Sequence, residues 1–393
     1  MRRASAPTLI VFCREPLPGY AKKRLAGRIG AECAATLADA FIAELCDRIR
    51  ACASEGKGVR IRGGGTKDFY GEAPAGAPLD VRDVCGIVSY APAELVLTAR
   101  GGTPLAEVEE ALAAHGQMLA FEPPRFGPGG TLGGVVASGL SGPRRPYAGA
   151  VRDFVLGTRV VDGTGTSIAF GGQVIKNVAG FDVSRLMTGA LGTLGVLTEV
   201  SLKCLPRPKV EVTRALACDA ATALRLMNEW GGRPLPISAT AHHDGVLRVR
   251  LSGTAAGVAS AQAIIGCDAI DGDAYWTALR DQTLDYFRPA IDGVAPLWRL
   301  SVRSTAPICD LPGAELIEWG GALRWLVPAP GCDGAAIRAW ATRHGGHATL
   351  FRSRDKSAGV FQPLPGPLAE VHERLRQVFD PHAILNPGRM YAR

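Results

Sequence analysis

The spacing of hydrophobic residues predicts a helix and a short strand near the start of the chain. Between Ala31 and Cys52, apolar side chains recur at three- and four-residue steps, which is the period of a helix with one buried face. The segment Val59–Arg62 instead alternates apolar and basic residues, as a strand does. A second helix is expected over Leu105–His115, because Pro104 suits an early helical position and Gly116 suits a helix end.

The rest of the chain mixes strands and helices without a regular strand–helix–strand repeat. Phe154–Gly165 predicts a strand that ends in an Asp-Gly hairpin turn, with Thr166–Phe170 as its partner strand. Further short elements are expected on both sides of this hairpin: strands over Val84–Val88, Glu94–Ala99, Val246–Leu251 and Leu323–Val327, and a helix over Ala220–Glu229. This mixture favours an α+β fold over a doubly wound parallel sheet.

Composition describes an ordinary globular protein with room for two domains. The chain has 393 residues, of which 47% are hydrophobic and 21% charged. The net charge of +7 is spread along the sequence rather than concentrated on one element with aromatic residues between the basic ones, which argues against a nucleic-acid-binding protein. A moderate positive charge instead suits anionic small molecules.

The ten cysteines are scattered, with no C-x-x-C pair and no cluster of metal-ligand spacing. This argues against a zinc site and against an iron–sulfur cluster in this chain, so no metal is expected. The first residues lack the apolar core and cleavage site of a signal peptide, and no apolar run approaches the ~20 residues that a spanning helix needs. We therefore expect a cytoplasmic protein with at most peripheral membrane contact.

Two glycine-rich segments carry the strongest chemical signal. Gly63–Gly65 follows the first predicted strand, and Gly127–Gly139 follows about sixty residues later. Glycine lets backbone N–H groups turn toward an anion, so two such loops would hold one diphosphate between them, although a single glycine-rich loop is more often a simple turn. The G-x-G-x-x-G spacing of a nicotinamide-binding Rossmann fold is not met by Gly63–Gly65.

These loops, together with Thr188–Glu199, resemble in order and spacing the FAD-linked oxidases with a PCMH-type (p-cresol methylhydroxylase-like) flavin domain. Within that superfamily, Val174–Asp182 and Phe379–Tyr391 look most like the FAD-binding E subunits of bacterial glycolate oxidases, and the resemblance extends from about Leu45 to the C-terminus. It implies an α+β protein in which a two-subdomain PCMH-type FAD-binding domain precedes a smaller, shortened α+β cap domain.

The resemblance also implies which residues contact the cofactor. The first loop contributes phosphate contacts, the second continues them, and a third loop and the C-terminal motif lie near the flavin, which gives the set Gly63, Gly64, Gly65, Thr66, Lys67, Pro124, Thr131, Gly133, Gly134, Ala137, Ser138, Gly139, Tyr147, Gly192, Gly195, Val196, Asn386 and Arg389. Relatives that attach FAD covalently use a histidine in the first loop or a cysteine further on. This chain has Thr66 and Lys67 in the first loop and no cysteine between Cys85 and Cys204, so non-covalent FAD is expected.

Three regions are expected along the chain. Residues 1–44 form an N-terminal extension, residues 45–206 the FAD-binding domain, and residues 207–393 the cap domain, of which 379–393 return to the flavin domain. Within the extension, Leu9–Leu25 resembles the opening of small glycosyltransferase-A-like proteins of the DUF2064 type. About forty residues are too few for that enzyme's fold, so a fused fragment or a mis-set start is the favoured interpretation.

No catalytic residue can be named from the sequence. Oxidation of a 2-hydroxy acid needs a base for the hydroxyl proton and a cation for the carboxylate. Arg352 and Arg354 could supply the cation, whereas His344 and His347 have no carboxylate beside them, and no general base is evident. The resemblance explains this gap, because it implies a D-type flavin subunit and an F-type iron–sulfur subunit as partners in glycolate oxidation. A stand-alone FAD-linked hydroxy acid or alcohol dehydrogenase and a catalytically silent FAD-binding scaffold remain as alternatives.

Overall fold

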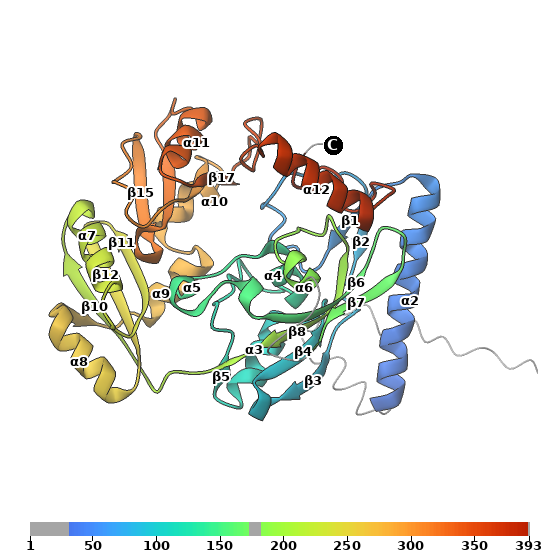
Figure 1. Cartoon of the computed structure of the whole chain (residues 1–393), viewed down its shortest axis with the longest axis horizontal. Helices are drawn as coiled ribbons and strands as arrows, with labels where there is room; N and C mark the ends of the chain where they lie inside the picture. Colours follow the sequence, from blue (N-terminus) through green and yellow to red (C-terminus); the bar gives the residue numbers. More distant parts are fainter. Residues whose placement is uncertain (1–30, 173–181, 392–393) are drawn as a thin grey trace, which may run out of the picture.

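Two large antiparallel sheets, each covered by helices, form the two halves of the molecule (Figure 1). The computed structural model describes residues 31–172 and 182–391. The predicted α+β class is confirmed, because sequential strands pair antiparallel within each large sheet. The DUF2064-like segment and nearly all of the Val174–Asp182 motif lie outside the described residues.

The first half is built on a five-stranded sheet in the order β3-β4-β8-β6-β7. Its strands are β3 (Ile87–Ala91), β4 (Val96–Arg100), β6 (Val155–Val161), β7 (Ser167–Gly171) and β8 (Val196–Lys203). The predicted 154–170 hairpin is confirmed as the β6–β7 pair, and Asp162 Oδ1 accepts the N–H of Thr164 and of Thr166 in its turn. The strand expected over 84–88 was misplaced, since Val84 and Cys85 form turn hydrogen bonds to Val81 and Asp83 and β3 begins later.

Helices α3 (Leu105–Ala113), α4 (Leu132–Ser138) and α6 (Val183–Leu186) accompany this sheet. Leu105, Val108 and Leu112 are fully buried at the spacing expected of one helix face, and they join the main core of this half. The two-residue strands β5 (Gln117–Met118) and β9 (Leu205–Pro206) pair with each other, and β9 is the last strand before β10 of the second half. The predicted helix over 105–115 is thus confirmed.

A separate layer lies beside the five-stranded sheet. It contains the long helix α2 (Ala31–Glu55) and the parallel pair β1 (Val59–Arg62) and β2 (Ala77–Asp80), so the first predicted helix and strand are confirmed. Ile42, Leu45 and Ile49 of α2 pack with β1, β2 and the C-terminal Ile384 and Leu385. The end of the chain therefore lies against its beginning, with Leu385 bridging to Val59.

The second half is an eight-stranded sheet in the order β13-β10-β12-β11-β15-β16-β14-β17. Its strands are β10 (Val210–Ala217), β11 (Ile237–His243), β12 (Val246–Gly253), β13 (Asp268–Ile270), β14 (Leu297–Ser301), β15 (Gly313–Glu318), β16 (Leu323–Pro328) and β17 (His347–Arg352). Helices α7 (Ala220–Gly231) and α8 (Ala255–Ile265) pack on the first strands over one shared apolar cluster, and α11 (Gly334–Arg343) packs on the last strand over a second cluster. The strands and helix predicted in this region are confirmed.

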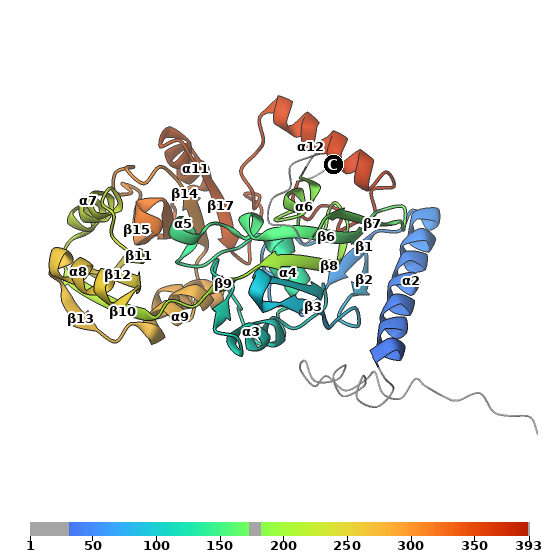
Figure 2. The ribbon, with the colours of Figure 1, turned by 60° about the horizontal axis from the view of Figure 1, so that its bottom comes forward.

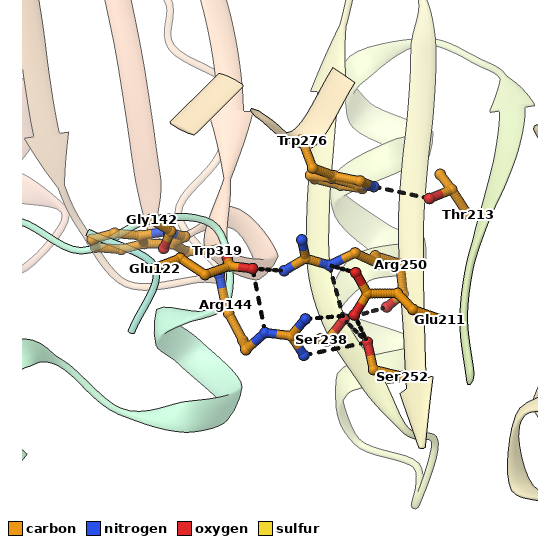
Figure 3. A network of polar contacts seen from close by, with 10 residues as sticks. All are labelled: Glu122, Gly142, Arg144, Glu211, Thr213, Ser238, Arg250, Ser252, Trp276 and Trp319. Carbon is orange, nitrogen blue, oxygen red and sulfur yellow. Dashed lines mark hydrogen bonds and ion pairs between the residues drawn. The ribbon is translucent and has the colours of Figure 1, made fainter. Parts of the chain in front are cut away.

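The two halves meet along a shared apolar cluster and a network of ion pairs. Short helices α5 (Arg145–Ala148), α9 (Asp273–Asp281) and α10 (Arg288–Ile291) lie near this interface, and Figure 2 shows α12 (Gly366–Phe379) above β6 and β7 of the first half. Leu140 and Leu191 of the first half are buried in one cluster with Trp319 and Phe351 of the second. Figure 3 shows Arg144 and Glu122 of the first half bonded to Arg250 and Glu211 of the second.

Candidate functional site

One cavity of about 220 Å³ lies in the first half, between the loop after β1 and the loop that leads into α4. The third loop, before β8, and the C-terminal segment complete its walls. All of the residues predicted to contact the cofactor line it except Pro124, Gly139 and Tyr147: Gly63, Gly64, Gly65, Thr66, Lys67, Thr131, Gly133, Gly134, Ala137, Ser138, Gly192, Gly195, Val196, Asn386 and Arg389. The structure therefore gathers segments that are up to about 320 residues apart in the sequence.

The first two loops touch at positions where only glycine fits. A Cβ on Gly64 would lie 1.5 Å from the carbonyl oxygen of Gly129, and a Cβ on Gly63 would lie 2.5 Å from the hydroxyl oxygen of Thr131. Gly65 has a φ of +72°, the left-handed region that other residues rarely adopt. The glycine run is thus required by the close approach of the two backbones at the edge of the cavity.

The first loop presents a row of free backbone donors. Within the part of the chain that the structure describes, the N–H groups of Gly63, Gly64, Gly65, Thr66 and Lys67 donate no hydrogen bond. Successive free N–H groups in such a turn form a concave anion site. This arrangement fits a diphosphate, which accepts several hydrogen bonds and carries the charge that such a loop attracts.

The first turn of α4 is occupied differently. The N–H groups of Leu132 and Gly133 donate to Thr103 and Gly101, and that of Gly134 donates to the side chain of Thr131, the helix N-cap. The α4 loop therefore shapes the cavity and supplies side chains such as Ser138, while the free backbone donors come from the first loop.

Asn386 holds the third loop and the C-terminus onto β1. Its Oδ1 accepts the N–H of Ile61 at 2.7 Å, and its Nδ2 donates to the carbonyl of Leu191 at 2.7 Å. Gly192 must be small because a Cβ there would lie 2.6 Å from this amide. Asn386, which lines the cavity, thus also positions the walls of the cavity through its side-chain amide.

Basic side chains make the cavity electropositive. Burial lowers the pKa of Lys67 to about 8, against the opposing influence of Asp281, and its ammonium forms no ion pair within the described residues. Arg389 donates to the carbonyls of Lys67, Asp68 and Glu72 and thereby braces the first loop, while Arg62 pairs with Asp68 at 2.9 Å. Lys67 and Arg60, neither of which forms an ion pair within the described residues, are therefore the lining cations that a bound phosphate could meet.

The predictions that miss the cavity have specific places elsewhere. Pro124 lines a second, smaller cavity at the interface between the halves. Gly139 ends α4 with a φ of +63°, and a Cβ on it would lie 3.1 Å from the Cα atom of Gly189. Tyr147 lies on α5, which packs on β11 of the second half.

Other lining residues were not predicted. They are Arg60, Ile61, Arg62, Asp68, Ala73, Pro74, Val81, Gly101, Leu191 and Leu197. Gly101 carried a usable signal, because it belongs to a Gly-Gly-Thr-Pro turn before a helix, and a Cβ there would lie 1.9 Å from the carbonyl oxygen of Leu197. The others are apolar or charged residues whose positions depend on the fold.

Comparison with known proteins gives this cavity a context. A protein family described as FAD binding domain matches residues 37–171, which contain the first two loops. The glycolate oxidase subunit GlcE of Escherichia coli (strain K12) is 47% identical over 348 residues, covering 88% of this chain and 97% of that protein. The chain belongs to the GlcE family.

Other relatives match a smaller part of the chain. Glycolate oxidase subunit GlcD of Bacillus subtilis (strain 168) is 30% identical over 45% of this chain, and the match spans 39% of that protein. A mitochondrial cytochrome-dependent D-lactate dehydrogenase of Saccharomyces cerevisiae is 29% identical over 34% of this chain and 22% of its own length. Among solved structures, an alkyldihydroxyacetonephosphate synthase covers 88% of this chain and 74% of its own with a TM-score of 0.61 at 15% identity, which shows a shared fold.

FAD is the cofactor of this family, and the cavity fits it. The free N–H row of the first loop suits the diphosphate, and Lys67 supplies a cation beside it. Among the described lining residues there is no histidine, cysteine or tyrosine, the side chains that form covalent flavin links. Over residues 31–172 and 182–391, no group of three or more His, Cys, Asp or Glu side chains is placed to hold a metal, and no helix is long and apolar enough to cross a membrane.

Proposed function

We propose that this chain is the FAD-binding subunit of a glycolate-oxidising complex, in which electrons from glycolate pass through FAD toward an iron–sulfur subunit. The observation that supports this most directly is the 47% identity to GlcE over nearly its whole length, combined with a cavity built from all three glycine-containing loops. The names GlcE and GlcD both describe subunits, so the related enzyme is a multi-subunit one.

The protein's own contribution to this chemistry is binding and orientation. FAD, when bound, supplies the two-electron acceptor. The N–H groups of Gly63–Lys67 hold the diphosphate, Asn386 fixes the third loop, and Arg389 braces the first loop through three carbonyls. The absence of a covalent-link side chain among the described lining residues supports non-covalent FAD.

The test is the visible spectrum of the purified chain under anaerobic conditions, before and after glycolate. A yellow protein whose flavin is released on denaturation, and whose flavin is reduced by glycolate only after a GlcD-type flavin subunit and an iron–sulfur subunit are added, is the expected result. Reduction by glycolate without partners would establish the stand-alone dehydrogenase. A chain that takes up no FAD would refute the flavoprotein proposal altogether.

We also propose that the complex works in the cytoplasm with at most peripheral membrane contact. Eight of the cysteines in the described part of the chain form no disulfide, which suits a reducing compartment. Cell fractionation tests this: the chain should be recovered with soluble proteins, or be released from membranes by high salt. Retention on membranes after a high-salt wash would contradict it.

A further inference from the structure

A second cavity lies between the two halves of the molecule. Its walls come from the first half through Phe126, Leu140 and Gly142. The second half contributes the end of α9, residues of β14, β15 and β16, and Phe351 of β17. The ammonium of Lys67, which lines the FAD cavity, lies 5.8 Å from the ring centre of Phe126, so the two cavities are neighbours. We call the second one the interface cavity.

Gln282 lines the interface cavity with an amide that has no partner. Its side chain is 2% exposed, and neither its Oε1 nor its Nε2 forms a hydrogen bond within the described part of the chain. Leaving a buried polar group unsatisfied costs about 1–3 kcal/mol, so native proteins rarely tolerate it. Gln282 caps the C-terminal end of α9 with a φ of +57°, and this left-handed conformation fixes the position of its side chain in the cavity wall.

Arg299 lines the same cavity with a cation that has no counterion at contact distance. Its guanidinium forms no ion pair and donates no hydrogen bond to any residue in the described ranges, and it lies 5.1 Å from the ring centre of Trp319. Burial lowers the pKa of Arg299, against the influence of Tyr70 and Glu318, but an arginine remains charged at neutral pH. A partly buried guanidinium without a carboxylate is a ready site for an anion.

Glu318, at the end of β15, lines the cavity beside them. It is 4% exposed, and its Oε1 accepts the indole N–H of Trp325 at 2.6 Å. Burial raises the pKa of Glu318 to about 7, although Trp325 and Arg299 lower it. In its protonated form the carboxyl can donate a hydrogen bond to an anion instead of repelling it.

We propose that the interface cavity binds a small 2-hydroxy carboxylate, with Arg299 holding its carboxylate and the Gln282 amide holding its hydroxyl group. This assignment rests on the proposed function, which places FAD in the adjoining cavity. The interface cavity is small, about 20 Å³ against about 220 Å³ for the FAD cavity, so an acid with a long side chain is excluded and glycolate, a two-carbon acid, is the ligand to test. Phe126, Leu140 and Phe351 close the cavity with apolar walls, which strengthens an ionic contact inside it.

Equilibrium dialysis of radiolabelled glycolate against the FAD-loaded full chain, under anaerobic conditions and without an electron acceptor, tests this proposal. We expect saturable binding at one site per chain that is weakened about tenfold to a hundredfold by Arg299→Met. Arg354→Met is the matched control, because Arg354 is an exposed arginine bonded only to the carbonyl of Asp292, and it should leave binding unchanged.

Gln282→Leu separates the hydroxyl contact from the charge. Wild-type chain should bind glycolate about threefold to tenfold more tightly than acetate, and the leucine variant should bind both equally. Retained FAD, measured by flavin absorbance, and the circular dichroism spectrum show that each variant is folded. If the wild-type chain retains FAD but shows no saturable glycolate binding, or if Arg299→Met and Arg354→Met bind alike, the assignment is wrong while the flavoprotein proposal stands. Loss of FAD from the wild-type chain would instead refute the proposed function.

Discussion

Replacing Arg144 by methionine would remove the cation that joins the two halves of the molecule. Its guanidinium donates to Glu122 Oε1 at 3.3 Å, Ser252 Oγ at 3.2 Å and Glu211 Oε2 at 2.5 Å, and its side chain is 8% exposed (Figure 3). Hydrogen bonds to charged groups contribute about 1.5–3 kcal/mol each. Arg250 remains 2.7 Å from Glu122 and 3.7 Å from Glu211 and recovers part of the loss. We therefore expect the free energy of unfolding to fall by about 3 kcal/mol, the low end for a broken buried ion pair.

Urea unfolding followed by tryptophan fluorescence measures this change, because all six tryptophans lie in the second half of the chain. The matched control is Arg225→Met, which removes an exposed pair with Glu229 and should change the free energy of unfolding by less than about 0.5 kcal/mol. The Arg144→Met curve should shift well beyond the control. The double variant with Arg250→Met should lose more than the sum of the two single losses, because each arginine partly compensates for the loss of the other at the same two carboxylates. Equal midpoints for Arg144→Met and Arg225→Met would refute this account of the interface.

Three further predictions concern the two cavities. Gly64→Ala should abolish FAD retention, because its Cβ would overlap the Gly129 carbonyl. Gly130→Ala is the control and should retain FAD, because its Cβ would meet nothing closer than 3.5 Å. The flavin absorbance of the purified variants measures both outcomes. Glu318, which faces Arg299, Glu122 and Tyr275, has a pKa raised to about 7, so it binds more protons in the folded than in the unfolded protein. Its contribution of ~3 kcal/mol to the free energy of unfolding should therefore be lost as the pH rises from about 4.5 to 7. Urea unfolding at several pH values measures this dependence, which Glu318→Gln should remove; an unchanged dependence in that variant would contradict the assignment. Lys67, with its pKa lowered to about 8, should take up a proton when FAD binds near pH 8, which calorimetry in buffers of different ionisation enthalpy detects, and Lys67→Met should abolish the uptake.

The FAD cavity was largely predictable because its signals are local. Gly63–Gly65 follows a strand whose alternation is clear, and a glycine run before a short helix marks the second loop. What the pattern could not supply was the direction of each side chain. Asn386 lines the cavity as expected of a cofactor contact, but the sequence did not indicate that it also bonds to Ile61 and Leu191, a role that depends on residues far away in the sequence. Tyr147 lies in the predicted region but on a helix that faces β11 of the second half.

The interface cavity could not be predicted, because its polar groups come from separate elements. Gln282 ends α9, Arg299 lies in the middle of β14, and Glu318 ends β15. Each of them alone is an unremarkable residue in a helix end or a strand. Arg352 and Arg354 were the arginines considered for substrate binding; in the structure Arg352 lies 3.5 Å from the ring centre of Phe69, and Arg354 is bonded to a backbone carbonyl. The sequence indicated the need for a cation without indicating which arginine lines the cavity between the halves.

The interface between the halves contains polar groups that are paired with one another and polar groups that are not, and the contrast between them supports the proposed ligand. Arg144, Arg250, Glu122 and Glu211 are fully paired with one another, so their desolvation is offset within the protein. Gln282 and Arg299 lie at the same interface with no hydrogen bond from their side chains to any described residue. If the interface existed only to join the two halves, apolar residues in their places would give a more stable protein, because an unsatisfied buried polar group lowers stability. A bound ligand would offset this loss of stability by forming the missing hydrogen bonds. A small anion with a hydroxyl group would bond to both Arg299 and Gln282.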